Sequence, residues 1–138
     1  MNVQRIRFIF AMLAAKTSMA IMKILRRNAT YLPGKIALAI DKRFLGGLTQ
    51  PKTVIAVTGT NGKTTVSNLL NSILLQNGFT VTNNSLGSNV QAGIATALIA
   101  DSTFSGKPKK EIAVLEVDER SSLLIYPYIK PDYLTSTV

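Results

Sequence analysis

The residues best suited to chemistry stand in one short run near the middle of the chain: Gly59, Thr60, Asn61, Gly62, Lys63, Thr64 and Thr65. The two glycines permit a tight turn in which backbone N–H groups converge on phosphate oxygens, and a helix that starts near Lys63 adds its positive end. Lys63 supplies charge to the outer phosphates of a nucleotide, and the Thr64 hydroxyl is placed to bind Mg²⁺. The run predicts a phosphate-binding loop for ATP, although Val57 stands where the usual motif has its first glycine.

Acidic residues gather at the end of a later apolar run, at Glu116, Asp118 and Glu119. Ligands of open α/β sheets bind at the carboxyl ends of the strands, so an acid there is placed to meet the metal held by the loop. Glu116 lies within the expected strand, where an unpaired acid is costly. We therefore predict Lys63 and Glu116 as catalytic residues, with Glu116 and Thr64 as the Mg²⁺ ligands. A solvent-facing acidic loop is the better interpretation for Asp118 and Glu119.

Residues 83–89 are rich in small side chains and amide donors, and they include Gly87, Ser88 and Asn89. They follow an expected strand and precede an expected helix. This segment is either a second anion-binding turn at the same edge of the sheet or an ordinary turn, since turns are commonly made of these residues. Composition leaves both interpretations open.

The elements around these motifs alternate between strands and helices. Residues 53–57 form a continuous β-branched apolar run, which is typical of a strand buried on both faces of a parallel sheet. The other expected elements are a helix over 66–77, a strand over 79–82, a helix over 92–100, and strands over 112–117 and 133–138. This order predicts an α/β fold with a mostly parallel sheet flanked by helices. The last strand has nothing after it, so we expect the domain to continue in a longer protein.

The first part of the chain has a different character. Residues 2–27 have helical periodicity, with Arg5, Lys16, Lys23 and Arg27 on one stripe and apolar residues on the other faces. Residues 28–34 are expected to break the helix, because Pro33 disfavours helical geometry in the residue before it, and a second helix is expected over 35–44. We therefore expect a basic helical segment over 1–50 and an ATP-binding domain over 51–138.

The basic helix allows two interpretations. It can hold the protein peripherally at the anionic inner face of the membrane, or its apolar face can pack on the ATP-binding domain while the basic stripe is solvated. The second interpretation is slightly favoured. Residues 8–15 are the longest uncharged run of this helix, too short to span a bilayer, and charges recur where a signal peptide would be apolar.

Charge and composition restrict the class of protein. The net charge is +9, and residues 1–50 hold nine Lys or Arg against the single acid Asp41. The chain has no cysteine, which excludes disulfides, thiolate metal sites and a cysteine nucleophile within it. A cytoplasmic location is expected. A nucleic-acid partner is not expected, because aromatic residues are sparse in the basic segment and no recognition motif is present.

Three of these features together resemble the central ATPase domain of the Mur ligase superfamily: the loop at residues 58–65, the strand end at Glu116, and Gly87-Ser88-Asn89. Members of this superfamily join an amine to a carboxylate through an acyl phosphate. The resemblance implies that Lys63 and the loop amides hold the ATP phosphates and that Thr64 and Glu116 serve Mg²⁺. It implies that Gly87, Ser88 and Asn89 face the substrate, and that this domain is incomplete at its C-terminal end.

Within the superfamily, Leu32-Pro33-Gly34-Lys35 and residues 85–90 resemble ligase subunits that amidate the D-glutamate of lipid II to D-isoglutamine. That likeness implies lipid II as substrate and a GatD-like glutamine amidotransferase subunit as partner. It places the family's four-cysteine zinc ribbon outside this sequence, and it implies that this chain alone is inactive. Two alternatives stay open: a ligase like folylpolyglutamate synthase, whose usual Gly-Lys-Gly-Ser differs from Gly62-Lys63-Thr64-Thr65, and a non-catalytic nucleotide-binding module.

Overall fold

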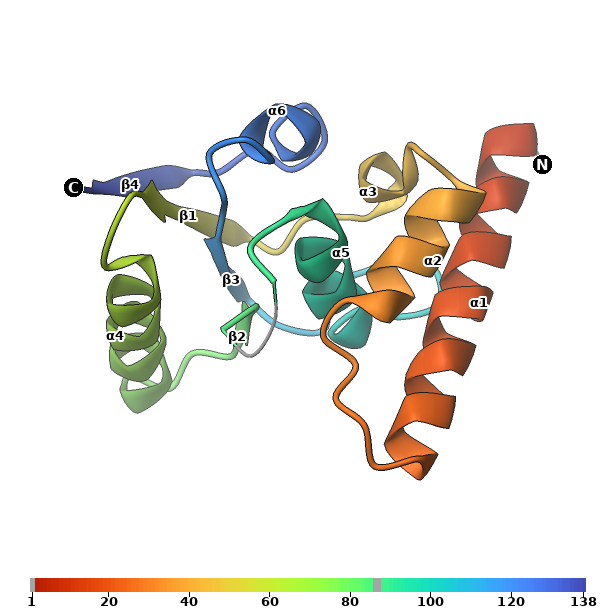
Figure 1. The fold of residues 1–138 in the computed structure, drawn as a ribbon, viewed down its shortest axis with the longest axis horizontal. Coiled ribbons are helices and arrows are strands. Elements are labelled where there is room, and N and C mark those ends of the chain that lie inside the picture. The colour runs from red at the N-terminus through yellow and green to blue at the C-terminus, as the bar shows by residue number, and fades with distance from the viewer. Residues whose placement is uncertain (1, 86–87) are drawn as a thin grey trace.

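The computed structural model describes residues 2–85 and 88–138. Its centre is a sheet of four parallel strands in the order β2-β3-β1-β4 (Figure 1). Their bounds are β1 Thr53–Gly59, β2 Val81–Asn83, β3 Ile112–Glu116 and β4 Tyr133–Thr137. The predicted α/β class is confirmed. β2 starts later than expected, because the backbone N–H of Thr80 donates to the Glu111 carboxylate rather than to a neighbouring strand.

The two central strands are buried on both faces, as the apolar run over 53–57 predicts. Val57 and Val114 point to one side, where helix α4 (Lys63–Gln76) covers them. Ala56 and Leu115, one residue away on each strand, point to the other side and join the larger core. Alternate residues of a strand thus serve two different cores, which requires apolar side chains at nearly every position.

The larger core lies between the sheet and a group of helices: α1 (Val3–Ile24), α2 (Leu32–Ile40), α3 (Phe44–Gly47), α5 (Gln91–Ala100) and α6 (Ser122–Ile125). Helix α5 contacts the sheet and α2, and α1 lies outermost against α2 and α5 (Figure 1). Phe8 of α1 stacks on Phe44 with ring centroids 5.0 Å apart. Residues before and after position 50 contribute to this one core. The domain boundary that the sequence predicts at this position stays a prediction.

The predicted break between the first two helices ends earlier than residue 34. Helix α2 begins at Leu32 and ends at Ile40, whereas the sequence led us to expect a helix over 35–44. Pro33 occupies the first turn, where a missing backbone N–H costs no hydrogen bond. Gly34 is buried and does not serve a turn, because a Cβ atom there would lie 1.9 Å from the carbonyl oxygen of Ala92. This glycine lets α2 approach α5.

Helix α1 packs on the domain through Phe8, Ala11, Met12 and Ala15. The expectation that the basic stripe is merely solvated is wrong for Lys16. Its ammonium group donates to the carbonyl oxygens of Ile99 at 3.1 Å and Ser102 at 2.7 Å, at the C-terminal end of α5, where carbonyls lack partners within the helix. Burial, with a smaller contribution from Lys109, lowers the pKa of Lys16, and Asp101 partly opposes this shift.

Among residues 2–85 and 88–138, no helix combines the length and the apolar character needed to cross a bilayer.

Candidate functional site

The predicted phosphate-binding loop joins β1 directly to α4. Gly59 has φ +126° and Gly62 has φ +80°, both in the region that favours glycine. Between them, Thr60 and Asn61 are exposed. Helix α4 begins at Lys63, as the loop motif predicts and three residues before the periodic run over 66–77, so the loop ends on the N-terminal turn of a helix of 14 residues. The order strand, glycine loop, helix is therefore confirmed, and the positive end of α4 faces the loop.

The two glycines are needed for different reasons. A Cβ atom on Gly59 would lie 2.2 Å from the carbonyl oxygen of Thr137, because β1 pairs with β4 as far as this position. Around Gly62 no atom lies within 4 Å of such a Cβ, so only its left-handed backbone requires glycine. The start of the loop is thus fixed by the neighbouring strand, and its end faces open space.

The Lys63 side chain folds back over this loop. Its ammonium group donates to the carbonyl oxygen of Gly59, four residues earlier. This contact holds a positive charge across the turn, next to the exposed backbone of Thr60 and Asn61. The arrangement presents a cation and a helix N-terminus to the same small volume, as phosphate binding requires.

Thr64 and Glu116 meet at the side of the loop. The Thr64 hydroxyl lies 3.1 Å from Oε1 and 3.2 Å from Oε2 of Glu116. Glu116 ends β3, which is the neighbour of β1 in the sheet, and its register partner is Val57. The structure therefore brings together the two side chains predicted as Mg²⁺ ligands.

The donor set fits Mg²⁺ bound together with a nucleotide. Magnesium in such sites takes one or two carboxylate or hydroxyl oxygens from the protein and completes its shell with phosphate oxygens and water. Thr64 and Glu116 offer such oxygens beside the loop. Within residues 2–85 and 88–138, no group of three or more His, Cys, Asp or Glu side chains offers an all-protein metal cage.

Asn84 links the backbone of Glu116 to the segment predicted to face the substrate. Its side chain is buried, accepts from the backbone N–H of Glu116 at 2.8 Å and donates to the Glu116 carbonyl at 2.8 Å. The same amide donates to the carbonyl of Ser88 at 3.2 Å. The Asn89 carbonyl accepts from the N–H of Asp118 at 2.8 Å. Ser88 and Asn89 thus lie beside the end of β3, while Gly87, the third residue of that prediction, lies outside the described residues.

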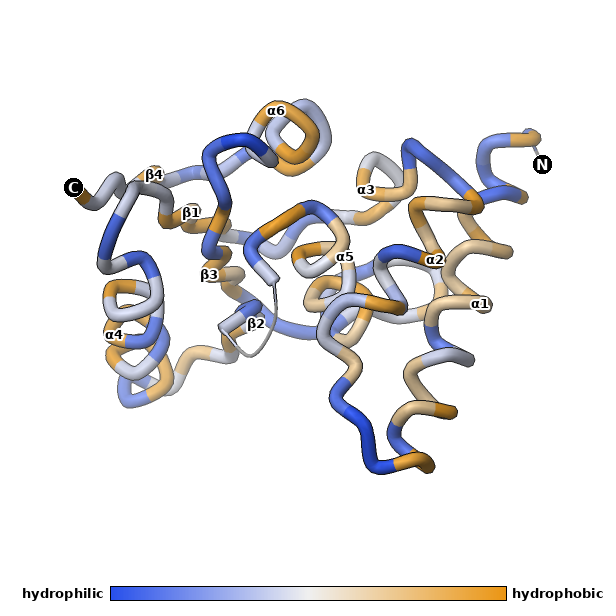
Figure 2. The backbone as a smooth tube through the Cα atoms, viewed as in Figure 1, coloured by the Kyte–Doolittle hydropathy of each residue, from blue (hydrophilic) through white to orange (hydrophobic). Residues whose placement is uncertain are grey.

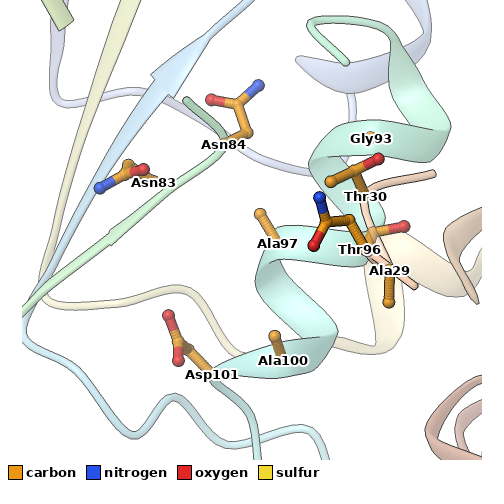
Figure 3. A pocket seen from close by; sticks show the side chains of 10 residues that line it. Ala29, Thr30, Asn83, Asn84, Gly93, Thr96, Ala97, Ala100 and Asp101 are labelled. Atoms are coloured by element: carbon orange, nitrogen blue, oxygen red, sulfur yellow. The ribbon is translucent and has the colours of Figure 1, made fainter. Parts of the chain in front are cut away.

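Asn84 also lines a hollow of about 320 Å³ between the end of β2 and helix α5. Asn83 and Asn84 lie on its sheet side, and Ala97 and Asp101 of the α5 region face them (Figure 3). Thr30, from the segment between α1 and α2, also lines it. No residue of the predicted phosphate-binding loop lines this hollow, so the hollow is separate from that loop.

Sequence reasoning missed Asn84. The available signal was the pair Asn83-Asn84 at the end of a short strand. Asparagine is common in ordinary turns, so this pair did not indicate a special role. What distinguishes them is tertiary: Asn83 bonds the Asn71 side chain and Ser85, whereas Asn84 bonds the backbone of Glu116, 32 residues away.

Comparison with known proteins agrees with this geometry. Residues 57–130 match the family model described as the Mur ligase middle domain. The chain is 40% identical over 126 residues to a protein of Streptococcus pneumoniae named lipid II isoglutaminyl synthase (glutamine-hydrolyzing) subunit MurT, and 39% identical over 128 residues to the MurT of Staphylococcus aureus. These alignments cover 91% and 92% of this chain but 28% of each relative. It is also 36% identical over 100 residues, or 71% of the chain and 18% of the relative, to a UDP-N-acetylmuramoylalanine–D-glutamate ligase of Corynebacterium jeikeium.

Proposed function

Because this chain belongs to the Mur ligase family, we propose that it is the ATP-binding part of a ligase of peptidoglycan synthesis that forms an amide from a carboxylate. The observation that carries the proposal is the contact of Thr64 with Glu116 beside a glycine loop that ends in Lys63. This contact brings a hydroxyl, a carboxylate and a glycine loop to one edge of the sheet, which supports the proposal that Mg²⁺ and phosphate bind there. Mur ligases in general depend on ATP and Mg²⁺.

In the proposed reaction, a substrate carboxylate oxygen attacks the γ-phosphorus of ATP and the bond to the ADP oxygen breaks, which gives an acyl phosphate. Ammonia then attacks the acyl carbon, and inorganic phosphate leaves with the bonding electrons. Lys63 and the N–H groups of the loop hold the phosphate oxygens and stabilise the charge that moves to ADP. Thr64 and Glu116 would hold Mg²⁺, which would neutralise part of the negative charge of the ATP phosphates.

The substrate proposal follows the names of the relatives. We propose that the carboxylate is that of D-glutamate in lipid II and that the product is D-isoglutamine. Ser88 and Asn89, which lie next to Glu116, face this substrate. The ammonia comes from a separate GatD-like glutamine amidotransferase subunit, a proposal supported by the relatives' name, which describes a subunit of a glutamine-hydrolyzing synthase.

The chain spans about 28% of the length of the curated relatives it matches, so we propose nucleotide binding for this chain and the complete reaction for the ligase assembly. We place that assembly in the cytoplasm, in peripheral contact with the inner face of the membrane, where a lipid-linked substrate is found.

Two measurements test the proposal in sequence. Calorimetric titration of the chain with ATP, with and without Mg²⁺, is expected to show metal-dependent binding. The chain within its ligase assembly is then incubated with ATP, Mg²⁺, ammonium and either lipid II or a folate carrying glutamate, and the products are identified by mass spectrometry. Amidated lipid II is the expected product. A glutamate-extended folate would replace the substrate proposal, and ATP binding without any product would favour a non-catalytic nucleotide-binding module.

A further inference from the structure

Helix α1 has a second apolar face that nothing in the described structure covers. Its residues recur at intervals of three and four positions, which places them on one line along the helix. The apolar members with large side chains are Val3, Ile6, Phe10, Leu13 and Ile24. Thr17 and Ala20 continue the same line, and both are exposed. Phe10 is 63% exposed and Ile24 79%, so this face, which we call the outer face of α1, is open to its surroundings.

The outer face is distinct from the face that packs on the domain. Phe8, Met12 and Ala15 of the packed face are buried, and they point toward α2 and α5. Figure 1 shows α1 at one edge of the molecule with α2 on its inner side, and Figure 2 shows that apolar residues dominate its turns. A helix that is apolar on two opposite faces is normally buried on both. A solvated outer face is therefore not the expected working state.

The charges that border the outer face have one sign. Arg7, Lys23, Arg26 and Arg27 are all exposed. The first acid of the chain is Asp41, which is buried and accepts from the Gln4 side chain. Within the described residues the only salt bridge joins Lys110 to Asp101, on other elements. The positive charge beside the outer face is therefore not compensated within the part of the chain that the structure describes.

This charge pattern indicates what kind of partner covers the outer face. The spacing alone would suit a second helix, but two copies of α1 packed face to face would bring Arg7 and Lys23 of one copy against the basic residues of the other. An anionic lipid surface meets both requirements. It takes apolar side chains into the acyl boundary and attracts basic residues at the headgroups. Long Arg and Lys side chains at the edge of such a helix reach the headgroups while their stems stay apolar.

We propose that the outer face of α1 is a membrane-binding surface that lies in the plane of an anionic bilayer. The proposal rests on the proposed function, because a lipid-linked substrate supplies the reason for membrane contact. It assigns the binding to Val3, Ile6, Phe10, Leu13 and Ile24 with Arg7, Arg26 and Arg27. Of the basic stripe that the sequence suggested, Lys16 does not belong to this surface, because its ammonium group is bonded to carbonyl oxygens at the end of α5.

Vesicle flotation of the intact chain tests this assignment. One set of vesicles is phosphatidylcholine alone, and the other is phosphatidylcholine with phosphatidylglycerol in equal parts. The wild type is expected to float with the anionic vesicles at low salt and to dissociate at high salt, because screening removes the headgroup attraction. The double variant Phe10→Ser/Leu13→Ser is expected to lose on the order of tenfold or more in partitioning. The matched control Leu123→Ser/Leu124→Ser, which removes two exposed leucines from α6, is expected to float like wild type.

A charge variant gives an independent readout. Arg7→Gln/Arg26→Gln/Arg27→Gln is expected to reduce binding to anionic vesicles and its dependence on salt, with no change in thermal melting. The proposal is overturned if wild type does not float with anionic vesicles, or if either variant floats like wild type. It is also overturned if Phe10→Ser/Leu13→Ser abolishes a dimer seen by sedimentation velocity while vesicle binding is absent, since the occupant is then a second copy. Titration of the same preparations with Mg·ATP separates this outcome from failure of the proposed function, because nucleotide binding does not use the outer face.

Discussion

The Thr64 hydroxyl and the Glu116 carboxylate are in contact, 3.1 Å apart at Oε1, although 52 residues separate them in the chain. Thr64 lies in the first turn of α4 and Glu116 ends β3, and the parallel pairing of β1 with β3 puts both at the same edge of the sheet. The hydroxyl donates to the carboxylate. We expect the Thr64 hydroxyl and the Glu116 carboxylate to bind Mg²⁺ in place of this hydrogen bond when a nucleotide is present.

Glu116→Gln should therefore act through the metal. The amide keeps the shape of the side chain but loses the charge, so affinity for ATP is expected to fall on the order of tenfold when Mg²⁺ is present and to change little when the metal is chelated. Titration calorimetry under the two conditions measures this difference. Glu119→Gln, an exposed neighbour, is the matched control. Equal losses with and without metal would make Glu116 structural.

Lys63→Ala should strongly weaken nucleotide binding and leave the fold intact. The side chain is only partly buried and its one bond goes to the Gly59 carbonyl, so it contributes charge to the loop rather than packing to the core. We expect Mg·ATP affinity to fall on the order of a hundredfold, as for loss of a hydrogen bond to a charged group. Lys52→Ala, at an exposed site before β1, should bind like wild type. An unchanged affinity for Lys63→Ala would remove the phosphate-loop assignment.

Gly62 and Gly78 form a matched pair for testing the loop. Their φ angles are +80° and +84°, and an added Cβ meets no atom within 4 Å at either site. Alanine should therefore cost each variant about 1 kcal/mol of stability through backbone strain alone. Only Gly62→Ala should weaken ATP binding, because only this strain falls at the N-terminus of α4. Thermal melting and nucleotide titration of both variants check this, and equal affinities would show that the loop does not hold phosphate.

Asn84→Ala should disturb both stability and the metal site. It leaves the backbone N–H and carbonyl of Glu116 without their side-chain partner in a buried place, so we expect a loss of about 3 kcal/mol in the free energy of unfolding. Asn77→Ala, which removes one exposed bond to the Ile73 carbonyl, should cost much less. Mg²⁺-dependent ATP affinity measured below the melting temperature should fall for Asn84→Ala only. Lost stability with unchanged affinity would limit Asn84 to a structural role.

The sequence predicts what local periodicity determines and misses what distant contacts determine. The strand over 53–57 and the placement of Glu116 follow from apolar runs that leave little choice of structure. The role of Lys16 does not follow, because its partners lie 83 and 86 residues away. The role of Asn84 and the start of α2 could not be predicted for the same reason. In each case the residue type has a common local use, and a tertiary contact overrides it.

Gly34 shows this most clearly. The dipeptide Pro33-Gly34 is typical of a loop, but in the structure it forms part of the first helical turn of α2. A Cβ on this residue would lie 1.9 Å from the Ala92 carbonyl oxygen and 2.7 Å from Thr96 Oγ1, and the Gly34 N–H donates to that hydroxyl at 2.8 Å. Gly34→Ala must therefore push α2 away from α5, and we expect a loss of about 3 kcal/mol in the free energy of unfolding. Denaturant unfolding measures it, with Lys35→Ala, exposed on the same helix, as the control. If residues 28–34 were an ordinary turn, alanine at position 34 would be tolerated and the two variants would unfold alike.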